Sequence, residues 1–123
     1  MSEGQARKLR QAAFVYLHVG ILYECAVVAI ARAGLLPESR GPLWVWLAFG
    51  AAIVAAIFWG LFYKRSVWLA RAVWLMQGFR LPALISRAFF PEAGVAIPPS
   101  FYVVALVVIV ISMWMMARAG WDL

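Results

Sequence analysis

The chain contains few of the residues that carry catalytic or metal-binding chemistry. Its 123 residues include one histidine, one cysteine and five acidic residues, against eleven lysines and arginines. A single cysteine excludes a disulfide within the chain, and no group of His, Cys, Asp or Glu has the spacing of a metal site. The sequence also lacks a nucleophile placed beside a base and a glycine-rich phosphate loop. We therefore predict that the protein is not an enzyme and holds no metal ion.

Apolar residues dominate the composition instead. Hydrophobic residues make up 67% of the chain and charged residues 13%, whereas apolar residues usually account for about 45–50% of a soluble domain. The length suffices for one domain, residues 1–123. Most of the basic residues behind the net charge of +6 flank hydrophobic segments, which is typical of a topology signal in a membrane protein. We predict an all-α integral membrane protein with no nucleic-acid partner.

Four apolar segments are long enough to cross a bilayer as helices. The first ends at Gly34, a common helix terminator, and Pro37 lies three residues further along. The fourth begins with prolines in its first turn and has Gly120 just past its end. We expect a bundle of four transmembrane helices, with spans at about residues 12–34, 43–63, 67–88 and 99–118.

The third span has two features that shape the bundle. The connection that precedes it, residues 64–66, is so short that the second and third spans should be antiparallel neighbours. Within the span, Pro82 has no N–H to donate to the carbonyl of Gly78, so we predict a kink there. An alternative interpretation ends this span near Arg80 and lays residues 83–90 along the membrane surface.

The basic residues predict how the bundle is oriented, because lysine and arginine accumulate on the cytoplasmic side of membrane proteins. With a cytoplasmic N-terminus, that side carries seven of them: Arg7, Lys8, Arg10, Lys64, Arg65, Arg71 and Arg118. The opposite side carries three: Arg32, Arg40 and Arg87. We therefore expect both termini to be cytoplasmic, and we expect the protein to reside in a bacterial cytoplasmic membrane.

Small residues repeat every fourth position along the second span, at Ala48, Ala52, Ala56 and Gly60. Such spacing allows two helix backbones to approach closely in a membrane. The stripe indicates either a dimer interface or packing within the chain, and we favour packing within the chain because three partner helices are available. The fourth span is apolar and bulky, which suits contact with lipid or with another subunit.

Polar residues share one face of the third span. Gln77, Arg80 and Arg87 recur at helical spacing, and the sole acidic residue inside a span is Glu24 of the first. At 1.5 Å per residue, Glu24 and Arg80 lie roughly 18 Å and roughly 20 Å from the cytoplasmic ends of their spans. A cation at such depth costs about 2.5–3.5 kcal/mol on insertion scales. We therefore predict a polar seam with a Glu24–Arg80 ion pair and Gln77 as its third member. The seam serves either to hold the helices together or as a proton or substrate site.

The single histidine, His18, lies inside the first span, roughly 9 Å from its cytoplasmic edge. Imidazole is a common axial ligand, so one interpretation is a ligand of haem or chlorophyll. The other is a hydrogen bond to a neighbour, such as Gln77, or Arg71 through water. Two-histidine ligation within one chain is excluded, because no second histidine exists. We predict no resident cofactor and keep pigment binding as an alternative.

One local pattern resembles a known family. Tyr16-Leu17, then Ile21-Leu22 and then Glu24 are similar to the first helix of the small multidrug resistance transporters. The resemblance implies a four-helix protein that works as an antiparallel dimer, in which Glu24 binds both protons and cationic drugs. Arg80 departs from that family's pattern, because an arginine in mid-membrane would neutralise the glutamate and repel cations.

Three functions follow from these features. The leading hypothesis is a non-catalytic accessory or assembly subunit of a larger membrane complex, whose partners are the lipid bilayer, other membrane subunits or a second copy. The second is a small proton-coupled transporter or channel that uses Glu24. The third is a haem- or pigment-binding subunit that uses His18.

Overall fold

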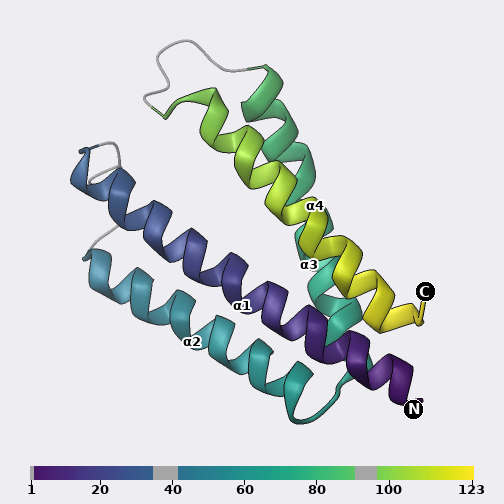
Figure 1. The fold of residues 1–123 in the computed structure, drawn as a ribbon. Helices are drawn as coiled ribbons and strands as arrows, with labels where there is room; N and C mark the ends of the chain where they lie inside the picture. The colour runs from purple at the N-terminus through teal and green to yellow at the C-terminus, as the bar shows by residue number, and fades with distance from the viewer. Residues whose placement is uncertain (1, 35–41, 91–96) are drawn as a thin grey trace.

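The computed structural model describes residues 2–34, 42–90 and 97–123, which fold into four helices and contain no strand (Figure 1). The prediction of a four-helix, all-α protein is therefore confirmed. The predicted loops before the second and fourth helices lie mostly outside the described residues. The helices are α1 (Glu3–Arg32), α2 (Leu43–Phe62), α3 (Val67–Phe89) and α4 (Pro99–Trp121).

α1 begins nearer the N-terminus than predicted, because the polar residues before the apolar segment continue the helix. The Ser2 hydroxyl caps it by accepting a hydrogen bond from the backbone N–H of Gln5 at 3.1 Å. Glu3 in the first turn interacts favourably with the positive end of the helix dipole. The resulting 30 residues span about 45 Å. α1 is thus longer than the hydrocarbon core of a bilayer, about 30 Å thick.

Three of the four helices, α1, α2 and α4, are long and apolar enough to cross a membrane. α3 does not reach this standard, so the prediction of four spanning helices is supported by length and hydropathy for three of them. Its polar residues, Arg71, Gln77, Arg80 and Arg87, lower its hydropathy. α3 is one helix that continues through Pro82 to its end at Phe89, and the alternative that ends the membrane span near Arg80 stays a prediction.

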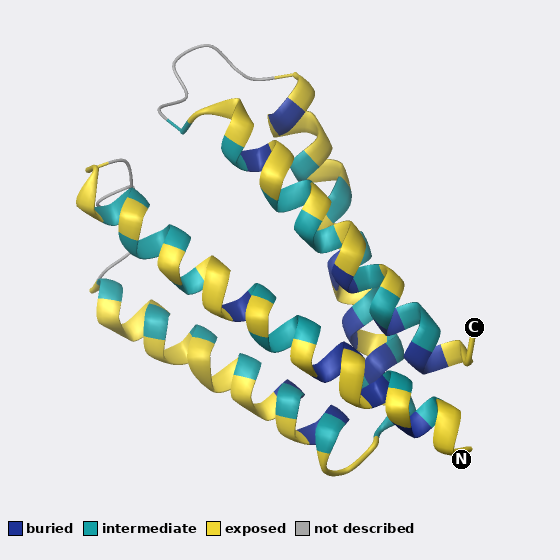
Figure 2. Cartoon of the chain, in the orientation of Figure 1, coloured by how far each residue is buried: buried dark blue, intermediate teal, exposed yellow. Residues whose placement is uncertain are grey.

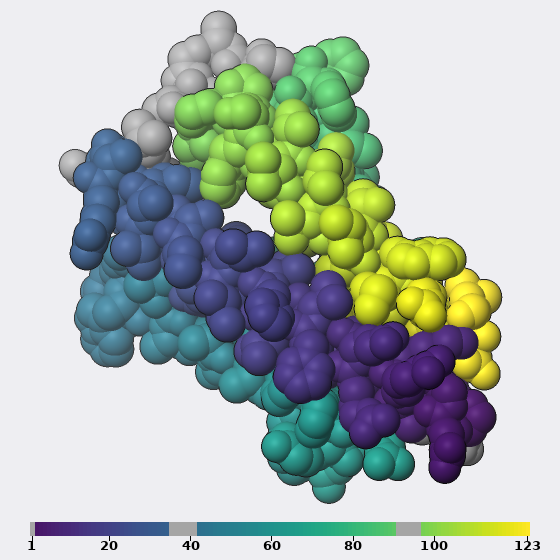
Figure 3. All heavy atoms as spheres, in the orientation of Figure 1, coloured from purple at the N-terminus to yellow at the C-terminus, as the bar shows by residue number. Residues whose placement is uncertain are grey.

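The helices associate as two hairpins, α1 with α2 and α3 with α4, and α1 also packs on α4 (Figure 1). The two hairpins converge at the end of the bundle that carries both chain termini and diverge toward the other end. A space-filling view shows an opening between α1 and α4 away from that end (Figure 3). α2 and α3 meet only slightly, so they are not the close antiparallel neighbours that the short connection between them predicts.

The hydrophobic core lies where the hairpins converge (Figure 2). It combines the start of α1, the end of α2, the start of α3 and the end of α4. Alanines contribute much of it, and their small side chains let the helix backbones approach closely. The buried core residues are Leu9, Ala12, Ala13, Ile57, Leu61, Ala70, Val73, Met116 and Ala119.

The stripe of small residues on α2 is divided between two environments. Gly60 is buried against the Leu69 side chain, whereas Ala48, Ala52 and Ala56 are exposed. The structure therefore does not use these three alanines for the packing within the chain that we favoured. The reason is that α2 presents another face to α1.

The interface between α1 and α2 combines a close glycine contact with aromatic rings. Gly20 of α1 lies so close to Val54 that a Cβ at position 20 would come within 2.7 Å of both Val54 methyl groups. Phe14 packs edge-on against Phe58 and Phe62, with ring centroids 5.7 and 5.4 Å away. The α1-facing side of α2 is therefore set by bulky side chains rather than by its alanines.

Candidate functional site

Glu24 lies at the interface of α1 and α2. It is half-buried, and its carboxylate rests against Gly50 of α2, where an added Cβ would collide with Oε1. Glycine at position 50 thus makes room for the carboxylate. Glu24 also lines an open groove together with Cys25, Val28 and Leu47. The acidic group within the first span is therefore accessible from outside the protein.

The structure does not join Glu24 to Arg80. Among the described residues the ion pair is instead Lys8–Asp122, with Nζ and Oδ1 2.9 Å apart. Arg80 is exposed on α3, within electrostatic range of the Tyr16 hydroxyl of α1. The predicted pair rested on equal depth, but α1 and α3 make few contacts. Equal depth therefore does not bring the two groups together.

The other members of the predicted seam turn toward α4. Gln77 is 6% exposed, and its Nε2 donates to the hydroxyl of Ser112 at 2.8 Å. Its Oε1 is buried without a hydrogen-bond partner. The Arg87 guanidinium lies over the ring of Tyr102, 5.7 Å from its centroid. Gln77 and Arg87 of α3 therefore contact α4, whereas Arg80 lies on the exposed surface of α3 within electrostatic range of Tyr16.

Side chains from two helices cap the C-terminal end of α4, where backbone carbonyls lack intrahelical partners. Gln5 Nε2 donates to the carbonyl of Ala119 at 3.1 Å, and Arg71 Nε donates to the carbonyl of Gly120 at 2.9 Å. The Lys8–Asp122 ion pair lies at the same terminus. Positive charge here also interacts favourably with the helix dipole. These contacts join the start of α1 and the start of α3 to the end of α4.

Two tryptophans hold the Arg71 side chain in place. Its guanidinium carbon lies 5.0 Å from the ring centroid of Trp68 and 5.5 Å from that of Trp121. Trp74 packs edge-on against Trp121 at 5.2 Å. Cation–π contacts of this kind contribute about 0.5–2 kcal/mol each, depending on desolvation. Arg71 is therefore a structural residue that links α3 to α4.

His18 is exposed on α1, and its Nδ1 lies 2.7 Å from the carbonyl of Phe14. The expected neighbours, Gln77 and Arg71, bond elsewhere. With the proton assigned to Nδ1, the ring donates to that carbonyl and Nε2 is the free nitrogen, an arrangement common for metal-ligating histidines. Among the described residues, no three His, Cys, Asp or Glu side chains group into a metal site.

Sequence reasoning missed Ser112, Gln5 and Asp122 as polar contacts. The sequence could have indicated Ser112, because this residue interrupts an otherwise apolar run in α4. It could not have indicated Gln5 and Asp122, because nothing in their spacing shows which residues they contact. Both residues gain their partners from the tertiary fold alone.

The fold defines a class: a helical bundle with three helices able to cross a membrane, consistent with an integral membrane protein. Comparison with protein-family models, with characterised proteins and with solved structures found no match to this chain. The features of the structure that bear on function are Glu24 in its open groove, Arg80 on the surface of α3, and the exposed apolar helix faces.

Proposed function

We propose that this protein is a non-catalytic accessory subunit of a larger membrane complex, which receives an acidic transmembrane helix of a partner between its two hairpins. The observation that carries the proposal is the position of Arg80. Its side chain is exposed on α3 within electrostatic range of Tyr16 of α1, and no described acidic side chain lies within ion-pair distance of it.

The packing of the helices supports a membrane position for all four of them. α3 lies along α4 over most of its length, so a membrane crossed by α4 would contain α3 as well. The chain termini lie together at one end (Figure 1), which fits an even number of crossings. The excess of basic residues at that end favours a cytoplasmic location for both termini.

Arg80 supplies the energetic argument for a partner. It lies 13 residues into α3, roughly 20 Å from the start of the helix, near the centre of a hydrocarbon core about 30 Å thick. Leaving its charge unpaired costs about 2.5–3.5 kcal/mol on insertion scales. A carboxylate on a neighbouring helix would recover much of this cost through a charge-assisted pair. Binding energy would therefore concentrate at one position.

Purification from native membranes in a mild detergent tests the proposal. We expect the wild-type protein to co-purify with other membrane subunits, and we expect Arg80→Gln to lose them while Arg80→Lys retains them in part. Arg32→Gln is the matched control, because Arg32 is an exposed arginine in the last turn of α1. Recovery of the wild type as a clean monomer or homodimer would contradict the proposal.

A second function is favoured by the position of Glu24. A Glu24 carboxylate paired with Arg80 would be neutralised and could not serve as a cation or proton site. In the structure, Glu24 and Arg80 are not paired. Glu24 instead lines an open groove beside Gly50. A transporter of this kind would lose pH-dependent cation uptake in liposomes on Glu24→Gln, while Glu3→Gln at the exposed N-terminus would retain it. Unchanged uptake in Glu24→Gln would exclude the transporter.

A further inference from the structure

Three arginines from two separate segments converge on one surface depression. Arg7 and Arg10 come from the first turns of α1, and Arg65 comes from the connection between α2 and α3. Glu3, Gly4 and Ala6 complete the lining, so the depression carries three positive side chains and one negative one. Like charges that converge in this way repel one another unless an anion lies between them.

The backbone explains how residues distant in sequence come together. Arg7 and Arg10 are three positions apart on a helix and therefore share a face. Arg65 has a φ of 52°, in the left-handed region that non-glycine residues seldom occupy. Immediately after it, the N–H of Ser66 donates to the carbonyl of Gly60 at 3.2 Å. The turn is thus held against the end of α2, and Arg65 is kept beside α1.

In a membrane crossed by α1 and α2, with its hydrocarbon boundary at the end of α2, the depression would lie at the level of the lipid headgroups. The rings of Phe14 and Phe62 are 5.4 Å apart, so the end of α2 is level with Phe14. Arg10 and Arg7 precede Phe14 by four and seven residues, which places them about 6 and 10 Å further out. The polar headgroup region on each side of a bilayer is about 5–8 Å thick. Arg10 therefore lies within the headgroup region, and Arg7 lies just beyond its outer edge, from where its long side chain can extend to a phosphate.

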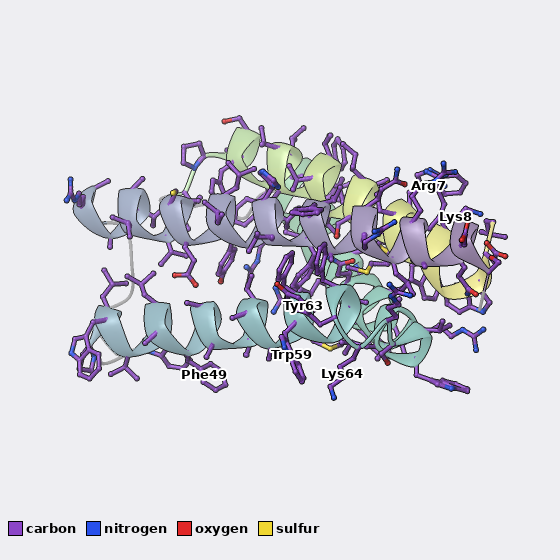
Figure 4. All side chains as sticks on the ribbon, turned by 60° about the horizontal axis from the view of Figure 1, so that its bottom comes forward. Arg7, Lys8, Phe49, Trp59, Tyr63 and Lys64 are labelled. Atoms are coloured by element: carbon purple, nitrogen blue, oxygen red, sulfur yellow. The ribbon has the colours of Figure 1, made fainter. Side chains whose placement is uncertain are left out.

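Aromatic residues at the end of α2 mark the same boundary. Figure 4 shows Trp59, Tyr63 and Lys64 toward this end of α2 and Arg7 on the first turns of α1. The Lys64 ammonium lies over the Trp59 ring, 5.0 Å from its centroid. Tryptophan and tyrosine concentrate at membrane interfaces. The arginines of the depression thus lie next to an aromatic belt.

We propose that Arg7, Arg10 and Arg65 bind a phosphate group, in the form of an anionic phospholipid headgroup or of a soluble phosphate. A guanidinium offers two parallel N–H groups to phosphate oxygens, and arginine is the side chain best suited to such bidentate contacts. Basic pockets between membrane helices on the cytoplasmic side bind anionic headgroups in the same way. The site is independent of Arg80 and of the proposed partner helix.

Native mass spectrometry of the full-length protein in a neutral detergent tests the site. The probes are phosphatidylglycerol, zwitterionic phosphatidylcholine and inorganic phosphate. We expect Arg65→Gln to weaken phosphatidylglycerol binding on the order of 10–100-fold, through loss of charge-assisted hydrogen bonds. The matched control is Lys64→Gln, one residue away, which should weaken binding on the order of fivefold or less, the generic contribution of a surface charge. Glu3→Gln should tighten binding.

The outcomes separate the possible ligands. Tight phosphatidylglycerol binding that Arg65→Gln weakens much more than Lys64→Gln supports a lipid site. Inorganic phosphate that displaces the lipid with the same dependence supports the site and assigns it to a soluble phosphate. Equal losses in Arg65→Gln and Lys64→Gln, or equal affinity for the two lipids, would overturn the proposal. If Arg65→Gln misfolds, Arg7→Gln on the exposed surface of α1 makes the same test.

Discussion

The buried hydrogen bond from Gln77 to Ser112 provides a direct test of how α3 and α4 are paired. Gln77 is 6% and Ser112 0% exposed, and Gln77 lies roughly 15 Å from the start of α3, too deep for water to replace the bond. Ser112→Ala would leave both polar atoms of the Gln77 amide unpaired. Hydrogen bonds between membrane helices contribute about 0.6–1.7 kcal/mol, and an unsatisfied buried group costs about 1–3 kcal/mol. We therefore expect a loss of about 1–2 kcal/mol.

A double-mutant cycle isolates this bond. Gln77→Met removes the donor together with the unpaired Oε1, and the Ser112 hydroxyl can then bond to a carbonyl in its own helix, so we expect a change within about 0.5 kcal/mol. In the Gln77→Met background, Ser112→Ala should have little further effect. Unfolding in mixed micelles, followed by circular dichroism, measures the four free energies. Equal effects of Ser112→Ala in both backgrounds would refute the bond.

Two further predictions concern the other interfaces. Gly20→Ala should destabilise the protein by about 1–3 kcal/mol through overpacking, because its Cβ would meet both Val54 methyl groups; Val54→Ala should rescue it. Gly78→Ala, whose Cβ would make an ordinary contact, should be neutral or stabilising in the same unfolding assay, and equal losses at the two glycines would contradict the packing. Arg71→Ala should cost about 2–3 kcal/mol, because it removes the bond to the Gly120 carbonyl and two cation–π contacts. Arg71→Lys should recover less than half of that stability, and full recovery would indicate that charge alone is required.

Sequence reasoning predicted the helices well because helix length and hydropathy are local properties. The predicted and observed ends of α2 and α3 differ by about one residue. The prediction missed the first turns of α1, because hydropathy identifies only the apolar part of a helix and not its polar continuation. Its third predicted span, α3, is less apolar along its most hydrophobic stretch than the other three helices, because Arg71, Arg80 and Arg87 each lower its hydropathy.

The polar residues illustrate what helical periodicity leaves open. Periodicity places Gln77, Arg80 and Arg87 on a broad face of α3, but it does not show which of them meets a neighbouring helix. Two of them contact α4, and Arg80 lies on the exposed surface of α3 within electrostatic range of Tyr16. The equal depth predicted for Glu24 and Arg80 fixes only their positions along the helix axes and not their positions across the bundle. The rotation of each helix about its axis and the distance between the hairpins decide the rest.

The sequence by itself determined that this chain forms four helices, three of them apolar enough to cross a membrane, and how far along its helix each of Glu24 and Arg80 lies. These properties depend on residue type and on a fixed rise per residue. Only the tertiary structure decided that α3 pairs with α4, that the hairpins diverge, and that Arg65 joins Arg7 and Arg10 around one surface depression. Which helices pair depends on which helix surfaces pack most closely against each other. In a membrane, close packing takes this role because the hydrophobic effect does not drive apolar helices together.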